Sequence, residues 1–182
     1  MRIGDVLYFS PRYRFSELDF DENKVVVDAF QDRVEGFYLL PASRLIEEGH
    51  AFAGGLVCCA AIEFIANTSG EVSASEWIRN NLTEFGKDSK LTDRFWNYFR
   101  NGLAHEGRVK AFGQGSGQFS LELQRLLTIA GSTLIVNPRL LLEAVQTAFR
   151  SYWEHLSENQ TARLVKSLRR YFEGEVEAVK IG

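Results

Sequence analysis

The chain has 182 residues, of which 45% are hydrophobic and 13% aromatic, a composition that supports a packed core and argues against a disordered chain. Its 21 Lys and Arg against 24 Asp and Glu give a formal charge of -3, so no global field attracts nucleic acid or anionic lipid, and any RNA contact must be local. With only three prolines, long helices can propagate, and we expect one mainly α-helical domain over residues 1–182.

The first forty residues are predicted to hold an extended segment and then a helix. Residues 2–9 are short and end at Ser10-Pro11, which indicates one strand or an extended arm. Asp5 interrupts the first hydrophobic residues, so the start lacks the pattern of a signal peptide, and we expect a cytoplasmic protein. From Asp21 onward, apolar residues at steps of four, four and three predict a helix that ends before Pro41: Val26, Phe30, Val34 and Phe37.

A second helix is predicted over residues 41–66, because a proline in the first turn of a helix costs no hydrogen bond. Its apolar stretch, residues 51–66, is broken by Glu63 and is shorter than the roughly 20 residues that a bilayer needs, which indicates a buried helix and no membrane partner. Cys58 and Cys59, the only cysteines, would point about 100° apart on it. We expect buried, reduced thiols that form neither a metal chelate nor a disulfide.

Two helices are predicted in the middle of the chain. A short one covers residues 75–85 and ends at Gly86. The next runs over residues 91–105 and ends at Gly107. Its apolar residues cover most of the circumference, so it should be central and largely buried: Leu91, Phe95, Trp96, Tyr98, Phe99 and Leu103.

Residues 108–136 predict a small β insert. Residues 109–112 and 118–123 indicate a hairpin around the glycine-rich segment 113–117, and residues 127–136, folded around Gly131-Ser132, add two more strands. The glycine-rich segment lacks the GxGxxG spacing and the strand-to-helix setting of a phosphate-binding loop. We therefore interpret it as a plain hairpin turn.

Two helices are predicted to close the chain. One follows Pro138, and the other covers residues 160–179. The last helix carries a basic stripe: Arg163, Lys166, Arg169 and Arg170. Such a stripe is more typical of a solvated helix face, and it would track an RNA backbone only if it faced the same groove as His105.

The concentrated chemistry of the sequence lies in Arg100-Asn101-Gly102-Leu103-Ala104-His105. These polar groups stand at the end of an otherwise apolar helix, where burying them without purpose costs free energy. On an α-helix Asn101 and His105 share a face, and Arg100 lies about 100° away from Asn101, so all three can reach one concave site. A phosphate suits such a site. The alternative is a satisfied polar network that ties this helix to its neighbours.

The Arg-x4-His spacing recurs at Arg150 and His155. We interpret that pair as the solvated side of an amphipathic helix, and His50, beside Gly49, as another surface residue. The asparagine directly after Arg100 and the aromatic helix before it favour the first match.

The segment from Arg100 to His105, followed by Glu106-Gly107, resembles the signature of the HEPN superfamily, helical domains with Arg, a polar residue often Asn, three residues and His near a helix end. The resemblance is strongest over residues 91–107 and otherwise rests on helix order. It implies a HEPN-like helical bundle in which the β insert over 108–136 is not part of the usual core. Gly107 stands where some toxin members have Tyr, so their partner, a minimal nucleotidyltransferase, is not predicted.

The resemblance further implies metal-free RNA cleavage without a cofactor, at a site formed where two motif helices meet in a homodimer. His105 would be the general base or acid for attack of an RNA 2′-hydroxyl on the neighbouring phosphate, since histidine exchanges protons near neutral pH. Arg100 would clamp the phosphate, and Asn101 would orient the histidine or the substrate. The expected products carry a 2′,3′-cyclic phosphate and a 5′-hydroxyl.

Supporting residues are expected outside the motif. Glu63 interrupts an apolar helix, and a carboxylate there should be paired with Arg100 or His105, unless it reaches solvent at the helix edge. The candidate RNA-binding residues are Arg163, Lys166 and Arg170.

Two functions follow from the motif. The first is a homodimeric endoribonuclease with a toxin or defence role, acting on cellular or invading RNA and controlled by an antitoxin or regulatory protein. The alternative is a non-catalytic dimeric module that binds a nucleotide, RNA or a partner protein, which the net acidity slightly favours. The two are discriminated by whether Arg100 and His105 face an open electropositive groove or are sealed by Glu63.

Overall fold

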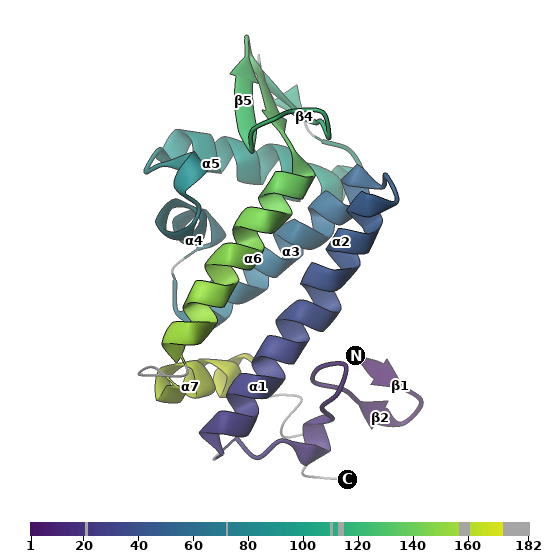
Figure 1. Ribbon diagram of the computed structural model, residues 1–182, viewed down its shortest axis with the longest axis vertical. Helices are drawn as coiled ribbons and strands as arrows, with labels where there is room; N and C mark the ends of the chain where they lie inside the picture. Colours follow the sequence, from purple (N-terminus) through teal and green to yellow (C-terminus); the bar gives the residue numbers. More distant parts are fainter. Residues whose placement is uncertain (21, 72, 110, 113–114, 157–160, 173–182) are drawn as a thin grey trace.

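The computed structural model describes the chain except for residues 21, 72, 110, 113–114, 157–160 and 173–182. The protein is mainly α-helical, with long helices side by side, a small sheet at one end and an N-terminal hairpin toward the other (Figure 1). The predicted class, mainly α with small β elements that include the N-terminus, is confirmed.

The first helical segment runs without a break through α1 (Asn23–Val34), η2 (Glu35–Leu39) and α2 (Leu40–Glu47). The predicted end before Pro41 is therefore wrong. Proline lacks an N–H and crowds the carbonyl four residues earlier, and the wider π-helical turn of η2, in which Leu40 N–H donates to the carbonyl of Glu35, takes up this misfit. The chain breaks instead after α2, where Gly49 adopts φ +85°.

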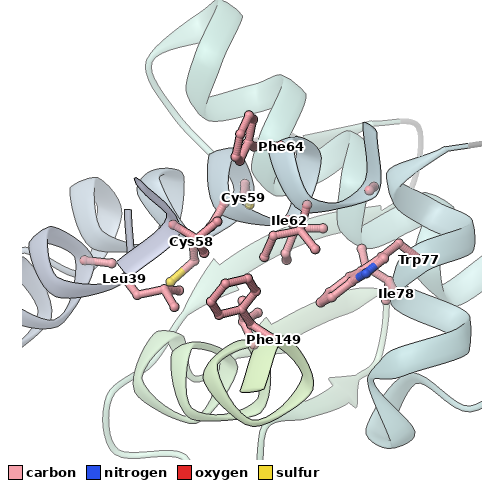
Figure 2. Packing of buried hydrophobic residues seen from close by; sticks show 14 of the residues in the cluster. Leu39, Cys58, Cys59, Ile62, Phe64, Trp77, Ile78 and Phe149 are labelled. Carbon is pink, nitrogen blue, oxygen red and sulfur yellow. The ribbon is translucent and has the colours of Figure 1, made fainter. Parts of the chain in front are cut away.

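Helix α3 (Ala51–Ser69) is the central helix, and it packs against α2 and against α6 (Pro138–His155). Figure 2 shows its side chains, Ile62 among them, gathered with those of neighbouring helices in the core. Cys58 and Cys59 are buried and free, as predicted, and burial raises the pKa of the Cys58 thiol to about 12. By length and composition alone α3 could cross a membrane, and 56% of its apolar window is buried in the fold.

Four elements follow α3: α4 (Ala74–Asn81), η3 (Thr83–Phe85), α5 (Ser89–Phe95) and η4 (Trp96–Glu106). Ser73 caps α4 by accepting a hydrogen bond from the backbone N–H of Glu76, and Asp88 caps α5 in the same way. The single helix predicted over residues 75–85 is thus a helix followed by a 3₁₀ turn. Helix α5 continues directly into η4, which ends at Gly107 with φ +66°.

The insert forms one four-stranded sheet: β3 (Ala111–Phe112), β4 (Gly115–Phe119), β5 (Leu127–Ala130) and β6 (Thr133–Val136). The two predicted strand pairs are present, but the strand predicted over residues 118–123 begins and ends earlier, as β4. Strands β3 and β4 are antiparallel, as are β5 and β6 around Gly131. The parallel pairing of β4 with β6, which joins the two hairpins in the order β3-β4-β6-β5, was not predicted.

Two glycines that were predicted to form a turn lie in strand β4. A Cβ on Gly115 would lie 2.3 Å from the hydroxyl of Tyr98, and one on Gly117 would lie 2.5 Å from Val109 and 3.1 Å from the ring of Phe99. These glycines therefore let the sheet approach η4 closely. Glycine stands at these two positions because the packing leaves no room for a side chain, and not because the chain turns there.

The chain returns to the helical layer through α6 and α7 (Thr161–Tyr171). Asn137 caps α6, and its side-chain N–H group also donates to the backbone oxygens of Leu121 and Leu123, which ties the connection between β4 and β5 to the start of α6. The predicted helix over 160–179 is confirmed from Thr161 to Tyr171, and its later part lies outside the described residues.

The N-terminal arm consists of β1 (Arg2–Ile3), β2 (Val6–Leu7) and the 3₁₀ turn η1 (Phe15–Glu17), where one strand or an extended arm was predicted. Asp32 on α1 holds the arm by accepting hydrogen bonds from the Ser10 hydroxyl at 2.7 Å and from the Arg12 side chain at 2.6 Å. Burial acts to raise the pKa of Asp32, but the hydrogen bonds from Ser10 and from the backbone and side chain of Arg12, together with the charge of Arg12, outweigh it and lower the pKa below its ordinary value.

Arg33, the next residue on α1, is surrounded by rings. Its guanidinium carbon lies 4.7 to 5.5 Å from the centres of four rings, which we call the aromatic cage: Phe9, Phe37, Phe64 and Phe172. Its Nη1 also donates to the backbone oxygen of Phe9. Arg33 thus joins the arm, α1, α3 and the end of the described C-terminal region.

Candidate functional site

The predicted motif lies on η4, which packs against α3 and touches β4. One side of η4 is buried, and there Phe99 stacks on Phe95 with ring centres 5.3 Å apart and meets Phe119 of β4 at 4.7 Å. The opposite side carries the polar groups of the motif. The helix is therefore anchored through its aromatic side, which leaves the motif at the surface of the bundle.

The winding of η4 brings Arg100 and His105 together. On an α-helix residues five apart are turned by about 140° from one another, so these two side chains would diverge. From Trp96 to Glu106 the helix is π-helical, and at its end Gly107 N–H donates to the carbonyl of Gly102, five residues earlier. A helix of this kind winds more widely and turns less per residue, so residues five apart lie more nearly on the same side than in an α-helix. The α-helical geometry assumed from the sequence is wrong, but the prediction that Arg100, Asn101 and His105 reach one site holds, because the wider winding brings Arg100 and His105 together.

Glu63 of α3 binds the guanidinium of Arg100, which is one of the two partners predicted for this carboxylate. Nη2 of Arg100 lies 2.9 Å from each carboxylate oxygen of Glu63, and Nε lies 3.2 Å from Oε2. The Arg100 side chain is 24% exposed and that of Glu63 is 39% exposed. This two-point contact fixes the plane of the guanidinium and directs Nη1 away from α3.

Nη1 of Arg100 meets the other two residues of the motif. It donates to the side-chain oxygen of Asn101 at 3.2 Å and lies 3.1 Å from Nε2 of His105, whose side chain is exposed. An arginine N–H can only donate, so Nε2 accepts in this contact and the neutral imidazole carries its proton on Nδ1. The structure therefore brings together all four predicted residues, Glu63, Arg100, Asn101 and His105, which we call the motif cluster.

Asn97 joins the motif cluster and was not predicted. Its side-chain oxygen accepts a hydrogen bond from Nδ2 of Asn101 at 3.0 Å, and its side chain is exposed. No sequence signal distinguishes it, because an exposed asparagine on a helix looks like ordinary surface. Its place four residues before Asn101, on the same helix, is the one pattern that could have identified it.

The motif cluster offers a base beside a fixed cation. His105 presents an unprotonated nitrogen, and Arg100 presents a permanent positive charge whose Nη1 side faces the histidine. Its charge is largely balanced by Glu63, so the cluster is not strongly electropositive. Among the residues that the structure describes, no three His, Cys, Asp or Glu side chains are grouped to hold a metal ion.

The structure places the basic stripe apart from the motif cluster. Arg163, Lys166 and Arg170 are exposed on α7, at the opposite end of the bundle from the sheet (Figure 1). The Arg163 guanidinium lies against Gly70, which ends α3. Gly70 follows Glu63 by seven residues, which is about 10 Å along a helix axis.

The second Arg-x4-His pair lies on α6. His155 is exposed, and its Nδ1 lies 2.8 Å from the backbone oxygen of Ser151, whereas Arg150 is exposed on another side of the helix. A cleft of about 920 Å³ opens between α4 and α6, and His155 and Tyr152 contribute to its lining. No residue of the motif cluster lines this cleft. It was not foreseen from the sequence, since its walls are far apart along the chain.

Comparison of the chain with protein-family models, with curated proteins and with solved structures gives no match in any of the three.

Proposed function

We propose that the protein is a homodimeric, metal-independent endoribonuclease of the HEPN type. The observation that carries this proposal is the 3.1 Å contact between Nη1 of Arg100 and Nε2 of the exposed His105. A base beside a fixed cation is the pair that attack of a 2′-hydroxyl on a neighbouring phosphate requires. The resemblance of residues 100–107 to the HEPN signature supports the same reaction.

In the proposed reaction a phosphate oxygen of the RNA takes the hydrogen bond of Arg100 Nη1 from Nε2 of His105. The lone pair of Nε2, free after this exchange, accepts the proton of the 2′-hydroxyl while the 2′-oxygen bonds to phosphorus. The bond from phosphorus to the 5′-oxygen then breaks, and the 5′-oxygen leaves with a proton from water. Arg100 stabilises the negative charge that develops on the phosphate oxygens. The products are a 2′,3′-cyclic phosphate and a 5′-hydroxyl.

The proposal also includes a second copy of the chain, a role for the basic stripe and a biological role. A second copy completes the site, because in the resembling family two motif helices meet. The basic stripe, about 10 Å beyond Glu63 along α3, contacts the RNA backbone away from the cleaved bond. The proposed role is that of a cytoplasmic toxin or defence component, which an antitoxin or regulatory protein controls.

The experiment is cleavage of a mixed RNA pool in EDTA, with chemical analysis of the product ends. We expect cyclic phosphate ends from the wild type and from His155→Ala, and none from His105→Ala or Arg100→Ala. His155→Ala is the matched control, because Arg150 and His155 repeat the same spacing. Equal cleavage by His105→Ala and the wild type would contradict the proposal.

The ion pair between Glu63 and Arg100 favours a second candidate function. Two of the three guanidinium nitrogens are held by this carboxylate, which balances the charge that a phosphate would need. A non-catalytic dimeric module, which binds a nucleotide, RNA or a partner protein, would use the motif cluster in this way.

The variant Glu63→Gln separates the two functions, because it keeps the shape of the side chain and removes its charge. If the protein is a nuclease, losing the fixed orientation of Arg100 lowers the cleavage rate. If it is a binding module, neither protein cleaves, and the uncovered charge of Arg100 tightens RNA binding in a titration at fixed salt.

A further inference from the structure

Asn97 begins a chain of contacts that ends on the imidazole of His105. Its side-chain oxygen accepts the hydrogen bond from Nδ2 of Asn101 at 3.0 Å. A side-chain amide has one donating and one accepting end. Once the donating end of Asn101 is bound to Asn97, its accepting end is turned toward Arg100.

Arg100, oriented by Asn101, in turn orients the histidine. Its Nη1 donates to the side-chain oxygen of Asn101 at 3.2 Å, while Glu63 holds Nε and Nη2 from the other side. Both ends of the guanidinium are therefore fixed. The remaining contact of Nη1 is with Nε2 of His105 at 3.1 Å.

This contact determines which ring nitrogen of His105 carries the proton. Since the guanidinium only donates, Nε2 must carry the lone pair and Nδ1 the proton. Free histidine in water favours the opposite form, with the proton on Nε2. The contacts of η4 thus select the less common tautomer, in which Nε2 is the basic atom.

We propose that Asn97 is a positioning residue that, through Asn101 and Arg100, holds His105 in the tautomer with Nε2 unprotonated. The catalytic consequence rests on the proposed function, whereas the tautomer itself does not. Asn97 is exposed and binds Asn101, so its effect on His105 is transmitted through Asn101 and Arg100.

The test is a long-range proton–nitrogen correlation spectrum of isotope-labelled full-length protein, at a pH at which the imidazoles are neutral. The spectrum distinguishes protonated from unprotonated ring nitrogens, and the His105 signals are those that His105→Ala lacks. His155 is an internal reference, since its Nδ1 faces a backbone oxygen that can only accept, which requires the proton on Nδ1.

In the wild type we expect the proton of His105 on Nδ1. Asn97→Ala should shift His105 toward the Nε2-protonated form and leave His155 unchanged. Asn97→Asp keeps the accepting oxygen and should restore the wild-type tautomer. Asn80→Ala removes an exposed asparagine on α4, far from the motif in the sequence, and should change neither histidine.

Two results would overturn the proposal: a wild-type His105 protonated on Nε2, or a His105 tautomer that is the same in Asn97→Ala and the wild type. If the wild type cleaves RNA, Asn97→Ala should lower kcat by about tenfold with little change in KM, and Asn97→Asp should recover most of the loss. A protein that shows the tautomer shifts but no cleavage would refute the nuclease and leave the positioning role intact.

Discussion

Arg33 and Arg100 are two largely enclosed arginines with opposite surroundings. The guanidinium of Arg33 lies within the aromatic cage, whereas that of Arg100 is met by a carboxylate, an amide and an imidazole. A cation among rings holds together the segments that carry those rings. A cation that is held from one side by Glu63 and faces a histidine on the other can take part in chemistry. The partners of a charge, more than its burial, therefore distinguish a structural site from a candidate catalytic one.

The largest expected effect on stability comes from Arg33→Ala. Removing this side chain empties the centre of the aromatic cage and releases the backbone oxygen of Phe9. We expect the free energy of unfolding to fall by about 3 kcal/mol. Urea unfolding measures it, and Arg100→Ala is the matched comparison, with an expected loss of about 1 kcal/mol because Glu63 still reaches solvent. Equal losses in the two variants would remove the distinction drawn between the two arginines.

A smaller effect is expected from Gly117→Ala, which tests the support beneath the motif. The new methyl group would press on Val109 and Phe99 and push β4 away from η4. We expect a loss of about 2 kcal/mol in the free energy of unfolding, together with shifted backbone resonances of η4. Gln118→Ala, at an exposed position of the same strand, is the control. A stable Gly117→Ala with unchanged η4 resonances would show that the sheet does not position the motif.

The smallest expected effect concerns Asp32, which holds the N-terminal arm to α1, and the pH dependence of the free energy of unfolding. The folded pKa of Asp32 lies below the ordinary value of 3.8, so its contribution to stability is fully present above that value and is lost as the pH falls through the folded pKa. Asp32→Asn should abolish this loss. Unfolding by urea between about pH 5 and pH 2 should give a shallower pH dependence for Asp32→Asn than for the wild type. Parallel curves for the two proteins would contradict the assigned role of Asp32.

Local patterns in the sequence predicted much of the fold and part of the motif cluster. The stripe of Val26, Phe30 and Val34 predicted α1, and the helical spacing after Pro138 predicted α6, because the period of apolar residues reflects which side a helix buries. Glu63 was found because a charge inside an apolar run needs a partner.

What the sequence did not predict depends on contacts between distant segments or on backbone hydrogen bonds without a residue signature. The π-helical winding of η4 has no characteristic composition, and the continuation of the helix past Pro41 depends on a similar turn. Gly117 resembled a turn residue, although its role is to let a strand approach Phe99. Asn97 is identified only once the side chain of Asn101 has been placed.

The proposed function requires that Arg100 serves chemistry and not the fold, and the variant Arg100→Lys tests this requirement. Lysine keeps the positive charge for Glu63 but lacks the planar fork that reaches Asn101 and His105 at the same time. Urea unfolding and RNA cleavage in EDTA are measured on the same preparations of wild type and variant. For Arg100→Lys we expect a free energy of unfolding within about 1 kcal/mol of the wild type and a cleavage rate reduced by about a hundredfold or more. A lysine variant that cleaves RNA as fast as the wild type, or a variant that loses its fold along with its activity, would contradict this requirement.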